Sequence, residues 1–114
     1  DYIMNCQGCH SPTGEGHGDV PAMDNYIGHF FKVEGGREFL VQVPGAANAA
    51  LSDERLATML NWMIAEFGGS SLPKVLKPYS AKEVGALRVN ALTEVSNLRG
   101  KLVGQIDEVL ASAN

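Results

Sequence analysis

The sequence predicts an all-α protein, because helical signals recur along its second half. Apolar residues repeat at helical spacing over 52–67 and again over about 93–111. A further helix start signal follows Pro78. The 114 residues contain no charge run or low-complexity stretch that divides the chain, so we expect a single domain over 1–114.

Composition and charge exclude two classes of function. The formal net charge of −4 argues against nucleic-acid binding, which needs basic stripes, and favours a partner with a positive docking patch. No apolar run approaches the ~20 residues that cross a bilayer, so we expect no membrane span. No signal-peptide pattern precedes Asp1, although removal of an export signal during maturation would leave the same sequence.

The first half of the chain has weaker helical signals. Residues 1–10, DYIMNCQGCH, fit a short helix up to Cys6. Glycine and proline then interrupt every periodic pattern over 11–50, which we expect to be mostly loop. The exception is the segment Arg37 to Val43, whose length fits either one or two helical turns or a short strand.

The clearest element is a helix that begins after Ser52. Ser52 is suited to cap it, acidic residues occupy its first turn, and Gly68 with Gly69 provides a stop. Its apolar stripe consists of Leu56, Met59, Leu60, Met63 and Phe67.

Two more helices are predicted towards the C-terminus. Ser80 and Glu83 fit a capping box that opens a short helix to about Val89. A longer helix is expected from about Thr93 to Ala111. Its apolar face consists of Val95, Leu98, Leu102, Ile106, Val109 and Leu110.

The motif that indicates chemistry is Cys6-Gln7-Gly8-Cys9-His10, a CxxCH sequence. On one helical turn its two thiols suit thioether bonds to the vinyl groups of haem, and the adjacent imidazole suits the iron. Three other interpretations fit the motif less well. A thioredoxin-like redox pair lacks the preceding strand, a zinc site lacks a second ligand pair, and a disulfide would close too small a loop to stabilise much.

These residues and their surroundings resemble the class I cytochrome c family over residues 1 to about 67. Tyr2 matches the family's aromatic residue four positions before the first cysteine. Pro21-Ala22-Met23 matches a proline followed two residues later by a large apolar residue on the histidine side of the haem. Leu51-Ser52-Asp53-Glu54 and Trp62 match the start and the aromatic residue of the family's last core helix.

The resemblance implies a small helical fold around one covalently attached haem c. The core would span 1–70, and residues 71–114 would form a helical extension. We expect that extension to pack on its own domain rather than on a partner. The residues implied to contact the haem are Cys6, Cys9, His10, Pro21, Met23 and Trp62, with His10 as an iron ligand. Arg37 or Lys32 is a candidate partner for a haem propionate, and the alternative for both is a solvated surface charge.

The chain departs from the family on the distal side of the haem. The family draws its sixth ligand, a methionine, from the loop before the last core helix, but here that loop is VPGAANAA. We favour Met63 as the ligand, because the shortened loop would let its helix lie closer to the iron. The alternatives are an open site or one of the following residues: Met59, His17, His29, Lys74, Lys77 and Tyr79.

The resemblance implies a one-electron carrier and not an enzyme, and no second catalytic group is evident in the sequence. Its partners would be a periplasmic dehydrogenase as donor and an oxidase or another cytochrome as acceptor. Because thioether attachment takes place in an exported compartment, the expected location is the periplasm. Two alternatives are a haem subunit of a permanent flavin or quinone dehydrogenase complex, and a five-coordinate haem sensor or gas-binding protein.

Overall fold

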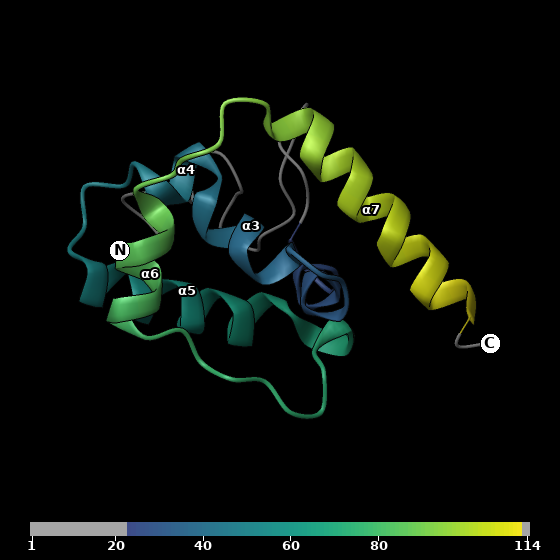
Figure 1. The fold of residues 1–114 in the computed structure, drawn as a ribbon. Helices are drawn as coiled ribbons and strands as arrows, with labels where there is room; N and C mark the ends of the chain where they lie inside the picture. Colours follow the sequence, from purple (N-terminus) through teal and green to yellow (C-terminus); the bar gives the residue numbers. More distant parts are fainter. Residues whose placement is uncertain (1–22, 113–114) are drawn as a thin grey trace.

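The computed structural model describes residues 23–112, and every regular element in that range is a helix (Figure 1). This confirms the predicted all-α class. The elements in chain order are η1 (Ile27–Lys32), α3 (Gly36–Gln42), α4 (Pro44–Ala47), α5 (Asp53–Phe67), η2 (Gly69–Ser71), α6 (Ala81–Arg88) and α7 (Val95–Ser112), where η marks a 3-10 helix.

The central helix α5 begins and ends where the sequence predicts. The Ser52 hydroxyl accepts a hydrogen bond from the Arg55 backbone N–H at 3.2 Å, which caps the first turn. Leu56, Leu60 and Ile64 of this helix are fully buried. The buried face of this helix therefore lies in the hydrophobic core. Both α6 and η1 pack against the helix.

The expectation of mostly loop over 11–50, outside the segment from Arg37 to Val43, is wrong for residues 27–32 and 44–47, which form η1 and α4. The segment that begins at Arg37, for which helix and strand were both open, is helical as far as Gln42. Each of these helices is too short to show a clear apolar period. They are held by packing instead: the rings of Phe30 and Phe39 stack with centroids 5.4 Å apart, and Pro44 occupies the first turn of α4.

The C-terminal helices share this core. Ser80 caps α6 by accepting from the Glu83 backbone N–H at 3.1 Å, as predicted. Tyr79, Val84, Leu102 and Ile106 are buried in one apolar cluster with the residues of α5. Helix α7 packs against η1, and in Figure 1 it extends away from the other helices towards the C-terminus.

One face of α7 is only partly covered. Leu102 and Ile106 are buried, whereas Val95, Leu98 and Leu110 are half-buried. Val109, which was predicted to lie on the apolar face, is exposed, so that face is narrower than the sequence pattern suggests. The helix bounds agree with the prediction to within two residues.

A backbone junction joins the start of the described chain to the end of α5. Asn25, which has a φ of 55°, donates its N–H to the Phe67 carbonyl at 2.7 Å. The Gly28 N–H donates to the buried Ser71 hydroxyl at 2.9 Å. A Cβ atom at Gly28 would lie 2.6 Å from the Ser71 carbonyl oxygen, so this close approach requires glycine.

Candidate functional site

Several residues predicted to form the haem site lie outside the described residues. These are Cys6, Cys9, His10, Pro21 and the alternative ligand His17. Their roles therefore stay predictions. The described part contains the other members of the predicted site: Met23 precedes η1, Arg37 lies on α3, and the rest lie on η1, on α5 and in the segment that follows α5.

Two methionines of the predicted site lie on one face of α5. Met59 and Met63 are four residues apart, and their exposed fractions are 4% and 6%. Met23 is buried in the same apolar cluster. Buried thioether sulfur is a donor that haem iron accepts, and an apolar cluster suits the macrocycle, so these residues fit a haem protein. Thioether side chains also fill irregular gaps in apolar cores. The buried positions of these methionines therefore suit either a role in the haem site or simple core packing.

Trp62 lies on α5, between Met59 and Met63 in the sequence. Unlike these two buried methionines, it is 49% exposed. Its ring meets the edge of Phe67 with centroids 5.9 Å apart. The predicted haem contact of Trp62 stays a prediction. What the structure adds is an exposed aromatic surface beside Phe67.

The alternative ligand His29 lies on η1 and is half-buried. Lys32 donates to its Nδ1 atom at 2.9 Å, and Tyr26 meets the imidazole edge-on. Burial and the nearby Lys32 charge both lower the pKa of His29. The neutral imidazole of His29 is therefore favoured, and its Nδ1 atom is already paired with Lys32. Lys32 itself is one of the two candidate partners for a haem propionate.

Tyr79, another alternative ligand, is fixed in the core by three hydrogen bonds. Its hydroxyl donates to the Arg37 carbonyl at 2.6 Å, and its backbone N–H and C=O both pair with the Asn61 side chain. Burial raises the pKa of Tyr79. Because a tyrosine ligand binds iron as the phenolate, this arrangement favours a structural role for Tyr79.

Arg37, the other candidate propionate partner, has all three guanidinium nitrogens occupied. It forms a two-pronged ion pair with Glu83, with N···O distances of 2.6 and 2.7 Å. It also donates to the carbonyls of Lys77 and Pro78, at 2.7 and 3.1 Å. Its guanidinium lies 4.2 Å from the centre of the Tyr79 ring. Arg37 therefore holds the segment after α5 in place.

The Arg37–Glu83 pair predicts a pH-dependent contribution to stability. Arg37 lowers the pKa of Glu83 below its usual value of 4.5, so the pair stabilises the fold above that pH and loses this effect as the pH falls. We expect Glu83→Gln to lower the free energy of unfolding by about 1 kcal/mol at pH 7, with the difference from the parent chain shrinking towards pH 4. Urea unfolding at several pH values tests this, and a difference independent of pH would contradict it.

A second arginine holds the shortened loop before α5. Arg88, at the end of α6, donates to the carbonyls of Ala47, Ala49 and Leu51 at 3.1, 2.7 and 2.7 Å. It also pairs with Asp53 at 3.1 Å. No local sequence signal links Arg88 to this loop, because its partners lie 35 to 41 residues away.

Residues 23–112 hold neither a metal cluster nor a membrane span. No group of three or more His, Cys, Asp or Glu side chains converges in that range to hold a metal ion. None of the helices of the same range has the length and apolar character that a membrane span requires.

Two known proteins match the chain, and both are named cytochrome c-552. One is from Thermus thermophilus and the other from a particular strain of the same species. Each is 32% identical to this chain over an alignment that covers 77% of the chain. The match spans 82% of the first relative and 72% of the second. No family model and no solved structure matches the chain.

Proposed function

This chain belongs to the class I family of c-type cytochromes, and from that premise we propose that it passes single electrons from a periplasmic dehydrogenase to a downstream oxidase or cytochrome. Proteins of this family carry covalently bound haem c and are electron carriers rather than enzymes. The observation that carries the proposal is the single CxxCH motif, Cys6 to His10, in a chain related to cytochromes c over most of its length.

The residues proposed to hold the haem come from two parts of the chain. Cys6 and Cys9 would hold the haem through two thioether bonds, and His10 would supply a nitrogen ligand to its iron. Met63 is the proposed second protein ligand to the iron, because it is buried on α5 and its sulfur would be a suitable donor. When bound, the haem supplies a one-electron iron couple. The buried side chains of α5 would help to exclude water from the bound haem, which is one means of setting its potential.

The proposed location and partners follow from the attachment chemistry and the family. Thioether formation requires reduced thiols and haem together in an exported compartment, so we place the chain in the periplasm. Contacts with the donor and the acceptor would be transient and small, below about 1,200 Å². Burial of Tyr79, Val84 and Ile106 within the chain's own core favours this carrier role over that of a permanent subunit, whose extra helices would need their apolar residues for an interface.

Replacement of Met63 tests the proposed ligand. We expect Met63→Leu, which nearly conserves volume, to abolish the sulfur-to-iron charge-transfer band of the oxidised protein and to lower its reduction potential. The reason is that a thioether ligand favours ferrous iron. The measurements are near-infrared absorption and a redox titration of the haem-loaded chain.

Met59→Leu is the matched control, since Met59 lies on the same face of α5 and is equally buried. It should retain the band. If Met59→Leu loses the band and Met63→Leu keeps it, the ligand is Met59. If the parent chain lacks the band and its reduced form binds carbon monoxide rapidly and completely, the carrier proposal fails in favour of a gas-binding protein.

A further inference from the structure

The segment between α5 and α6 crosses the surface as an extended strap, here defined as residues 72–80. It is anchored at both ends: Ser71 before it is completely buried, and Tyr79 is fixed by Arg37 and Asn61. Between these anchors the side chain of Val75 is 89% exposed, the highest value among the large apolar residues of the described chain. A well-anchored segment thus presents apolar surface to solvent.

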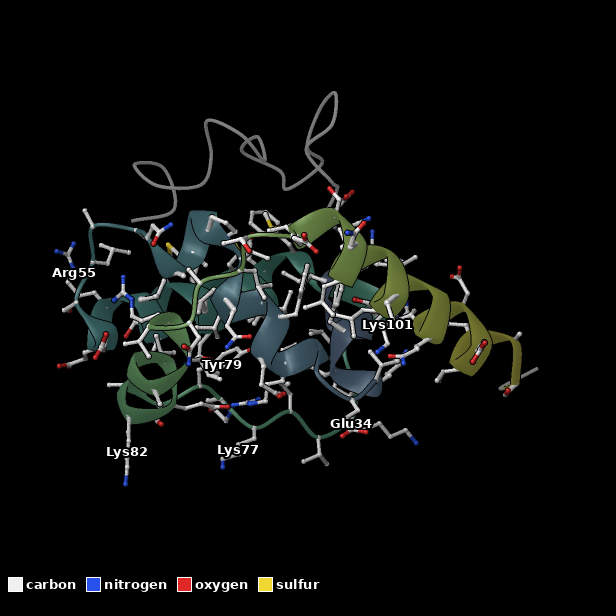
Figure 2. All side chains as sticks on the ribbon, turned by 45° about the horizontal axis from the view of Figure 1, so that its top comes forward. Glu34, Arg55, Lys77, Tyr79, Lys82 and Lys101 are labelled. Atoms are coloured by element: carbon white, nitrogen blue, oxygen red, sulfur yellow. The ribbon has the colours of Figure 1, made fainter. Side chains whose placement is uncertain are left out.

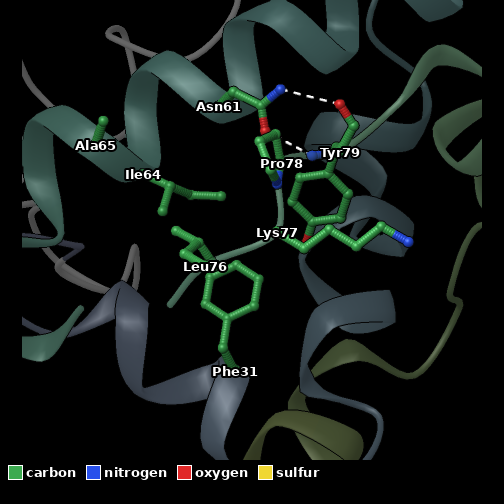
Figure 3. A pocket seen from close by; sticks show the side chains of 8 residues that line it. All are labelled: Phe31, Asn61, Ile64, Ala65, Leu76, Lys77, Pro78 and Tyr79. Atoms are coloured by element: carbon green, nitrogen blue, oxygen red, sulfur yellow. Dashed lines mark hydrogen bonds between the residues drawn. The ribbon is translucent and has the colours of Figure 1, made fainter. Parts of the chain in front are cut away.

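An open apolar hollow lies beneath the strap. Its volume is about 180 Å³. Figure 3 shows Phe31 and Leu76 pointing into it, with Ile64 of α5 opposite them. The polar groups of Asn61 at its edge are already paired with the Tyr79 backbone, so the hollow offers an incoming group mainly apolar contacts. It suits one aliphatic side chain.

Lys77 lines this hollow, and two more lysines, Lys74 and Lys82, lie within five residues of it in the sequence of an otherwise acidic protein. Residues 67–82 contain Lys74, Lys77 and Lys82 but no Asp or Glu, whereas the whole chain has a net charge of −4. All three lysines are exposed, and Figure 2 shows Lys77 and Lys82 projecting from the same side of the molecule. The strap and the start of α6 therefore carry a local charge opposite in sign to that of the chain.

Several acidic residues border this part of the chain, beginning with Glu66 directly before residue 67. Glu83, next to Lys82, is neutralised by its two-pronged pair with Arg37. Glu38 lies close enough to influence the pKa of Tyr79, and Figure 2 shows Glu34 on the same side as Lys77. Glu34 lies in the loop after η1 and Glu38 lies on α3, so these two residues limit the basic surface on that side. The strap itself contains no acidic residue.

We propose that the strap and the hollow beneath it form a docking surface for a protein partner that presents an aliphatic side chain flanked by carboxylates. The aliphatic side chain would fill the hollow, and the carboxylates would face Lys74, Lys77 and Lys82. An anchor in a pocket with a charged rim is typical of protein interfaces, and the rim charges speed encounter and select the partner. This surface is distinct from any surface that binds a positively charged partner. The acidic remainder of the chain favours a partner of that second kind.

A synthetic peptide, Asp-Glu-Leu-Glu-Asp, is the probe for this surface. It is added to the isotope-labelled, haem-loaded chain in its reduced form, and binding is followed by nuclear magnetic resonance. We expect it to shift the backbone signals of Phe31, Ala65 and Leu76, all of which line the hollow. Replacing the central Leu of the peptide by Ala should weaken binding, and added salt should weaken it further.

Two matched pairs of variants separate the charged rim from the hollow. Lys77→Glu should weaken binding about threefold or more, while Lys101→Glu, on α7 away from the strap in Figure 2, should not. Ala65→Leu, which fills the hollow, should weaken binding, while Ala111→Leu at the exposed end of α7 should not.

The proposal is overturned if these signals do not respond to the peptide, or if each variant behaves like its control. It is also overturned if the same signals shift with the concentration of the chain alone, since a second copy would then be the occupant. No electron transfer enters this measurement, so its outcome is independent of the proposed function.

Discussion

Replacing both Cys6 and Cys9 by serine is expected to yield a chain that carries no covalent haem. A serine hydroxyl does not form the thioether that links a cysteine to the haem vinyl groups, so both attachments are lost. The denatured double variant should have the mass of the bare polypeptide and show no haem absorption, even when produced in a host that matures c-type cytochromes. The effect is expected to be complete rather than graded.

Gln7→Ala is the matched control for this prediction. It changes a residue between the two cysteines but keeps the spacing of Cys6, Cys9 and His10, so it should load haem normally. A double serine variant that retained haem after denaturation would refute the assigned attachment. A parent chain that stayed colourless in the same host would remove the haem interpretation altogether.

The C-terminal half of the fold could be predicted from local sequence because its helices have strong local signals. The helix α5 has a capping serine, acidic first-turn residues and an uninterrupted apolar stripe, and α6 has Ser80. The short helices over 27–47 have weaker signals, of which Pro44 in the first turn of α4 is one. Their stability comes from contacts such as the stacked rings of Phe30 and Phe39, which are made only after the chain has folded.

The candidate site also contains one part that local sequence predicts and another part that depends on the fold. The CxxCH motif is local, so its chemistry can be interpreted from five adjacent residues. The identity of the second iron ligand would depend on position in space, and Met59 and Met63 share both a helix face and burial. The two arginine networks also escaped prediction. The propionate role considered for Arg37 did not anticipate its pair with Glu83, which lies 46 residues further along the chain.

Removal of the Arg88 guanidinium is expected to cause the largest loss of stability among single substitutions in the described chain that leave the apolar core unchanged. Arg88 provides hydrogen bonds to three carbonyls of the loop before α5 and pairs with Asp53. Arg88→Met keeps the apolar stem but leaves those carbonyls without this donor. We expect the free energy of unfolding to fall by about 3 kcal/mol, as measured by urea unfolding of the haem-loaded chain at pH 7.

Two further variants show whether the carbonyl bonds are responsible for that loss. Lys82→Met removes an exposed cation from the same helix and should change stability by less than about 0.5 kcal/mol. Arg88→Lys keeps the charge but lacks the planar fork that reaches three carbonyls, so it should recover only part of the loss. If Arg88→Lys were as stable as the parent, charge alone would hold the loop. If Arg88→Met lowered the free energy of unfolding no more than Lys82→Met does, the hydrogen bonds from Arg88 of α6 would not be responsible for holding the shortened loop before α5.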